Sequence, residues 1–69
     1  MIVRLRKDIL TSVMWSSWGD TASVAGRMHE GEVAIVIESN KHKGGNGTRI
    51  ITSAGITGWT YNSNLMEIK

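Results

Sequence analysis

The 69-residue sequence contains no cysteine, no proline and no phenylalanine. Without cysteine the chain can form neither disulfides nor thiolate metal sites, which separates it from small secreted domains that depend on such cross-links. Without proline it has no polyproline segment. It also lacks a run of about 18 apolar residues, the length that a membrane-spanning helix requires. These absences predict a soluble, cytoplasmic protein that does not associate with membranes.

Length and charge narrow the class further. A chain of 69 residues has room for one domain, covering residues 1–69, and a domain of this size buries roughly 60% of its unfolded surface. Eight basic and six acidic residues give a net charge of +2, well below that of a dedicated nucleic-acid arm. Charged residues interrupt the apolar ones in segment 1–8, so no export signal is expected and the domain is predicted to stand alone.

Residues 33–38 form the clearest predicted strand. Val33, Ile35 and Ile37 are β-branched and would share one face of a ribbon with a period of two residues. Val36 makes the opposite face partly apolar as well. A helix is not expected here, because β-branched residues lose side-chain freedom in a helix.

Other strands are expected on either side of this one. Segment 1–5 places Val3 and Leu5 on one inward face, and segments 48–53 and 56–61 are rich in strand-forming residues. A turn at residues 54–55 separates the last two segments, and the polar, glycine-rich residues 41–47 predict a mobile hairpin loop before them. Several short strands with turns between them indicate a small barrel or sandwich.

Residues 6–27 allow two interpretations. Ile9, Leu10, Val13 and Met14 recur at a spacing that would suit one amphipathic helix. Turn-forming residues at 16–17 and 19–20 favour a long excursion with irregular strands instead. Whether residues 8–18 form a helix or a loop therefore stays open. The excursion is preferred because two segments farther along the chain resemble those of a known β family.

Two segments resemble signatures of bacterial SH3 domains. Residues 24–33 (VAGRMHEGEV) have the family's order of apolar residue, glycine, apolar residue and charged-glycine turn, with the turn at Glu30-Gly31. Residues 55–65 (GITGWTYNSNL) are similar to its glycine hairpin, Gly-Trp pair, short helix and closing strand. The resemblance implies an all-β, SH3-like barrel of about five strands. It further implies a long loop after the first strand, a one-turn helix before the last, and Trp59 as a plug of the barrel.

The chain departs from the SH3 domains that bind proline-rich peptides. Those domains carry an Ala-Leu-Tyr-Asp-Tyr type segment near the start and a tryptophan after the mobile loop, and neither is present here. Tyr61 and Asn64 stand where those domains carry a proline and a tyrosine. Polyproline recognition is therefore not expected, and binding of cell-wall peptides, the role of many exported bacterial members, remains a second alternative.

Segment 15–20 (WSSWGD) is the strongest candidate for a binding site. It places two indoles among small polar residues, on the excursion that SH3-like folds use as one wall of their ligand groove. Such a pair can anchor a partner, or it can pack over the open end of the barrel as core, and both interpretations stay open. The candidate ligand-binding residues are Trp15, Trp18, Asp20, Tyr61 and Asn64.

A basic surface offers a different kind of site. Basic residues interleaved with aromatic ones are typical of proteins that bind single-stranded nucleic acid. The candidate nucleic-acid contacts are Arg4, Arg6, Lys41, Lys43 and Arg49. Salt dependence of binding would separate this hypothesis from a protein interface.

Metal and catalytic chemistry find little support. His29 and His42 have no carboxylate or thiolate at a recognised ligand spacing. Glu30 and Glu32 flank a turn glycine and are expected to be exposed, whereas a general acid needs a shifted pKa. We therefore expect neither a cofactor nor a metal nor an enzyme. The sequence predicts a non-catalytic accessory protein of a bacterium or bacteriophage that binds another protein, with nucleic-acid binding as the alternative and homo-oligomerisation left open.

Overall fold

The computed structural model describes residues 1–19, 22–40 and 45–68. Within these ranges the chain is all β apart from one 3-10 helix, η2 (Asn62–Asn64). None of the described residues belongs to a helix that is long and apolar enough to cross a membrane. The strands are β1 (Ile2–Leu5), β2 (Thr11–Trp15), β3 (Val24–His29), β4 (Val33–Ser39), β5 (Gly47–Thr52), β6 (Thr57–Tyr61) and β7 (Leu65–Glu67).

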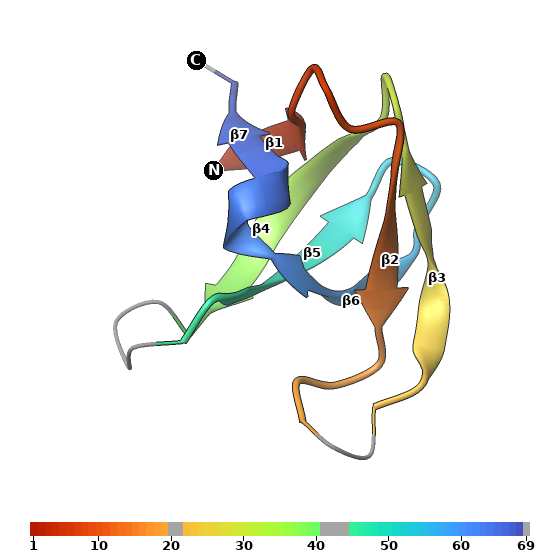
Figure 1. The fold of residues 1–69 in the computed structure, drawn as a ribbon, viewed down its shortest axis with the longest axis vertical. Coiled ribbons are helices and arrows are strands. Elements are labelled where there is room, and N and C mark those ends of the chain that lie inside the picture. Colours follow the sequence, from red (N-terminus) through yellow and green to blue (C-terminus); the bar gives the residue numbers. More distant parts are fainter. Residues whose placement is uncertain (20–21, 41–44, 69) are drawn as a thin grey trace.

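All described strands join one antiparallel sheet in the order β3-β2-β6-β5-β4-β1-β7. The sheet curls into a half-barrel, and β7 returns beside β1 so that the first and last strands are neighbours (Figure 1). Irregularities in register within β2 and β4 help the sheet to bend, because a bulge increases local twist. The predictions of an all-β fold and of a one-turn helix before the last strand are confirmed.

The predicted strand count was too low. Seven strands are described where about five were expected, because the supposed long loop after β1 contains the hairpin β2–β3. Segment 11–15 is a strand, neither a helix nor a loop. Ser12 and Met14 are buried while Thr11 is exposed, so the period is two, and the polar character of Ser12 hides that alternation in the sequence.

The inward positions of β1 are as predicted, since Val3 and Leu5 are buried. In β4, Val33, Ile35 and Ile37 do share one face, but it is the outer one, and all three side chains are exposed. The inner face of β4 carries the buried Ala34 and the half-buried Val36, which packs against the core. A strand that is apolar on both faces can be oriented only by its neighbours in the sheet.

The core of the half-barrel is small. Met14, Met28 and Ile50 are fully buried inside it, and a side chain at Gly58 would place its Cβ 3.0 Å from the Cβ of Met14. There is no space for an indole at this point. The expectation that Trp59 plugs the barrel is therefore wrong: Trp59 lies next to Gly58 in β6 and alternates to the outer face, so aliphatic and methionine side chains form the core.

Two of the predicted turns depend on glycine. Gly31 and Gly55 have φ angles of 87° and 84°, values that L side chains rarely adopt. They confirm the turns predicted at residues 30–31 and 54–55. Residues 41–44 of the predicted mobile loop lie outside the described residues.

The neighbouring residues Ile50 and Ile51 test this inward and outward assignment. Ile50→Ala is expected to lower the free energy of unfolding by about 2–4 kcal/mol, because it leaves a cavity in the core. Ile51→Ala removes the same atoms from the outer face and should cost less than about 1 kcal/mol. Urea denaturation of dilute protein measures both, and equal losses would show that the register of β5 is wrong.

Candidate functional site

All the aromatic side chains of the protein gather on the outer surface at one end of the sheet. Trp15 ends β2 and is paired in register with Trp59 of β6. Tyr61 follows on the same face of β6, and Trp18 lies on the loop after β2. The sequence has three tryptophans, one tyrosine and no phenylalanine. These four residues, the aromatic cluster, therefore leave the core without aromatic side chains.

Trp18 lies at the centre of the cluster. Its ring centroid is 6.3 Å from that of Trp59, with the rings tilted, and 5.0 Å from that of Tyr61 in an edge-to-face arrangement. Gly47, the register partner of Tyr61, lies against the Trp18 ring, since a Cβ there would be 2.7 Å from two ring atoms. The bare backbone of Gly47 thus provides the surface on which the indole rests.

The loop that carries Trp18 is held closed at its base. Ser16 N donates to the carbonyl oxygen of Ser23 over 2.7 Å, and Ser23 N donates to Ser16 Oγ over 3.1 Å. Within the loop, Ala22 N donates to Gly19 O. This base places the loop beside β6, so Trp18 reaches the other aromatic rings.

An open cavity of about 210 Å³ lies at this end of the sheet. Among the described residues, its walls carry no charged side chain, and Tyr61 is 46% exposed. The cavity is smaller than the roughly 300 Å³ at which small-molecule sites begin. It suits one apolar side chain of a larger ligand better than a cofactor. The lining residues are Trp15, Ser17, Trp18, Gly19, Ala22 and Tyr61.

The structure brings three of the five predicted ligand-binding residues together, namely Trp15, Trp18 and Tyr61. Asp20 lies outside the described residues. Asn64 does not line the cavity. Its side chain belongs to a polar chain within the barrel, which gives it a structural role.

Asn64 links the helix η2 to β2. Its Nδ2 donates to Ser12 Oγ over 3.1 Å, and the buried hydroxyls of Ser12 and Thr60 are 2.7 Å apart. The carbonyl oxygen of Asn64 also accepts a hydrogen bond from Arg6 N. Thr48 donates to Asn62 at the other end of the same helix. These bonds satisfy buried hydroxyls that would otherwise cost free energy.

The three predicted nucleic-acid contacts that the structure describes do not form one surface. Of these three, Arg49 lies beside the aromatic cluster, as the register partner of Trp59, and it forms a 3.9 Å ion pair with Glu38. Arg4 lies on β1, with β4 between its strand and β5, and Arg6 follows the end of β1. Lys41 and Lys43 lie outside the described residues.

Sequence reasoning missed two members of the site, Trp59 and Gly47. A signal for Trp59 was present in β6, where Gly58 and Thr60 alternate with larger residues. A small or polar pair facing inward requires Trp59 and Tyr61 to share the outer face. Gly47 could not be recognised, because its role depends on the register of β5 against β6.

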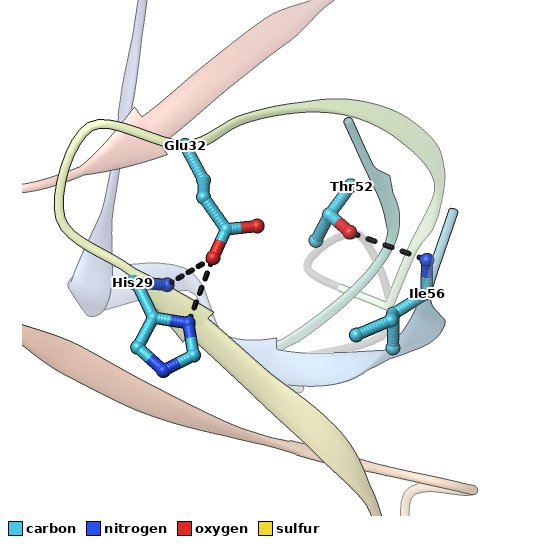
Figure 2. Close-up of polar contacts among 4 residues, drawn as sticks. All are labelled: His29, Glu32, Thr52 and Ile56. Carbon is cyan, nitrogen blue, oxygen red and sulfur yellow. Dashed lines mark hydrogen bonds and ion pairs between the residues drawn. The ribbon is translucent and has the colours of Figure 1, made fainter. Parts of the chain in front are cut away.

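Glu32, next to Gly31, closes a turn with His29. Glu32 Oε1 accepts a hydrogen bond from His29 N over 2.9 Å and lies 2.8 Å from His29 Nδ1, and Thr52 Oγ1 accepts one from Ile56 N in another turn (Figure 2). Among the residues that the structure describes, no group of three or more histidine, cysteine or acidic side chains could hold a metal ion. The contacts of Glu32 and Thr52 therefore stabilise turns at this end of the sheet.

Comparison of the chain with models of protein families, with curated proteins and with solved structures found no match.

Gly47→Ala tests the seat of Trp18. The added methyl would overlap the indole, so Trp18 should move and expose its ring, shifting tryptophan emission to longer wavelength. Gly19→Ala is the control, because a Cβ at Gly19 has nothing within 4 Å. Emission spectra and indole N–H resonances measure the effect. A Gly47→Ala spectrum identical to that of the wild type would contradict the placement.

Asn64→Ala separates a structural role from a ligand role. Loss of the bond to Ser12 should lower the free energy of unfolding by about 0.5–1.5 kcal/mol and leave the indole resonances unchanged. Ser63→Ala, an exposed change in the same helix, is the control. Shifted indole resonances with unchanged stability would argue against this assignment.

Proposed function

We propose that this chain is a non-catalytic protein-binding module that holds one apolar side chain of a partner protein in its aromatic cluster. The carrying observation is the cavity walled by Trp15, Trp18 and Tyr61, whose described lining residues carry no charged side chain. Aromatic side chains bury the largest apolar areas of any residues and dominate the energy of protein interfaces. None of the four aromatic rings belongs to the core of this small domain, so their apolar surface can contact a ligand.

The cavity also favours a particular kind of contact. Its volume of about 210 Å³ suits a single side chain, and the described walls offer indole and phenol surfaces with small residues between them. A leucine, methionine or similar side chain entering it would exchange water for aromatic contact. The neighbouring backbone of the partner would lie across the outer face of β6.

The fold supports an SH3-like barrel as the scaffold. Strands β4, β5 and β6 are adjacent in the sheet, η2 precedes the last strand, and that strand pairs with β1. The hairpin β2–β3 then corresponds to the excursion that carries one wall of the groove. In this proposal the additional strands belong to that excursion, and the other strands form the barrel.

Binding of single-stranded nucleic acid is the second candidate, and Arg49 is the observation that favours it. Its side chain is exposed beside Trp59, and a cation next to stacked rings suits phosphate and base. The ion pair with Glu38 and the distribution of the other arginines over the sheet weigh against it. Protein binding is therefore our leading proposal.

Selection from a displayed library of random linear peptides tests the proposal. Peptides that bind the wild-type protein should bind Tyr61→Ala and Trp18→Ala at least about tenfold more weakly, because an anchoring pocket is lost. Leu10→Ala removes an exposed apolar side chain away from the site and should leave the affinity unchanged. Calorimetric titration gives the dissociation constants.

Two results would decide against this account. Peptides that bind all variants as tightly as the wild type would remove the aromatic cluster from the interface. Tighter binding of an oligothymidylate, falling steeply between low and high salt, would favour the nucleic-acid function. Peptide affinity that persists in about 0.5 M salt is the expected result for an apolar anchor.

A further inference from the structure

A row of four isoleucines crosses the outer face of the sheet, away from the aromatic cluster. Ile51 of β5 pairs with Ile35 of β4, which pairs with Ile2 of β1. Ile68 N donates to Ile2 O and continues the row past β7. Paired residues of an antiparallel sheet project from the same face. Three adjacent strands and the residue that follows β7 thus present the same large aliphatic side chain side by side.

These side chains are open to solvent. Ile51, Ile35, Ile2 and Ile68 are 37%, 55%, 49% and 38% exposed. The exposed Val33, Ile37 and Met66 extend the row along the strands. A groove of about 320 Å³ runs between β1, β4 and β5 over this surface. We call these seven residues the isoleucine face.

The exposed area of the isoleucine face is large enough for a dimer interface. Its exposed fractions amount to roughly 600 Å² of apolar surface, the upper end of the largest patch on a typical monomer. Two such faces packed together would bury on the order of 1,200 Å², which reaches the range of stable, specific interfaces. The isoleucine face of one copy therefore provides half of the buried area that a stable dimer requires.

The symmetry of the isoleucine row favours a second copy as the occupant. A twofold axis along the row places the isoleucines of one copy against those of the other, so the face is complementary to itself in hydrophobicity, as a twofold interface requires. Arg4, at the Val33 end of β4, then meets the opposite end of the partner face, where Glu38 and Arg49 form their ion pair.

We propose that the isoleucine face packs against the same face of a second copy, forming a twofold dimer of two face-to-face sheets. Aliphatic side chains from facing sheets interdigitate at a separation of about 10 Å. The inference goes beyond the proposed function and does not depend on it. The aromatic cluster lies on β2, on the loop after β2 and on β6, away from the isoleucine face. Each dimer would therefore present two accessible aromatic sites.

Sedimentation equilibrium from about 1 µM to about 1 mM protein tests the dimer. The wild type should show a concentration-dependent monomer–dimer equilibrium. Ile35→Glu should raise the dissociation constant at least about 100-fold, because it places two carboxylates in the apolar centre. Leu10→Glu, which adds the same charge at a 66% exposed position off the face, and Tyr61→Ala should associate like the wild type.

A wild type that stays monomeric throughout would overturn the proposal, as would an Ile35→Glu variant that folds and still dimerises. Circular dichroism establishes that the variants fold. If Ile35→Glu does not fold, Ile35→Thr keeps a β-branched residue on the strand and should weaken association in the same direction. Unchanged association of Ile35→Thr and loss of it in Tyr61→Ala would assign the contact to the aromatic cluster and refute the isoleucine face.

The absence of cysteine allows a direct test of proximity. Ile35→Cys lies at the centre of the row, so a short bis-maleimide should link two copies through it, since facing sheets are about 10 Å apart. Leu10→Cys should give no more cross-linked dimer than random collision. Equal yields from the two variants would count against the proposed face.

Discussion

The narrow interior of the curled sheet is the constraint on which the rest of this structure depends. Met14, Met28 and Ile50 are fully buried in it, and the strands approach so closely that Gly58 has no room for a side chain beside Met14. Methionine suits such an irregular space because its side chain is unbranched and flexible. Indoles do not fit, so they are displaced to the outside of the sheet.

Among the described residues, more large apolar side chains are consequently exposed on the surface than are buried in the core. The two parts of this surface differ in chemistry: the aromatic cluster surrounds a cavity, whereas the isoleucine face is a broad aliphatic surface on the strands from β5 to β7. A cavity suits one anchoring side chain, and a broad face suits another sheet. The outward side chains of both parts that lie on strands follow from the alternation along strands that enclose a small core, whereas Trp18 is placed by the loop after β2.

Much of the fold could be predicted from local patterns. Residues 33–38, the glycine turns at Gly31 and Gly55 and the short helix at 62–64 each have a local physical cause. The strand β2 could not be recognised, because buried Ser12 occupies an inward position and its hydrogen bond to Thr60 forms only in the folded protein. The outward orientation of Ile35 was hidden for a similar reason, since neighbouring strands decide it.

The candidate site was predictable in part. Trp15 and Trp18 stand out in the sequence as two indoles among small residues, and Tyr61 followed from the resemblance. Their meeting depends on the pairing of β2 with β6, which no local pattern contains. Asn64 was assigned to the ligand surface by position alone, whereas its hydrogen bond to Ser12 turns it toward the barrel.

The partition between a small core without aromatic side chains and half-buried or exposed aromatic rings on the outer surface is the central claim, and paramagnetic relaxation by a soluble gadolinium chelate tests it most directly. In dilute native protein, the ring protons of Trp18 and Tyr61 should relax several times faster than the methyl protons of Met14 and Ile50. Equal protection of the aromatic rings and these methyl groups would show that the indoles belong to the core and would contradict the account.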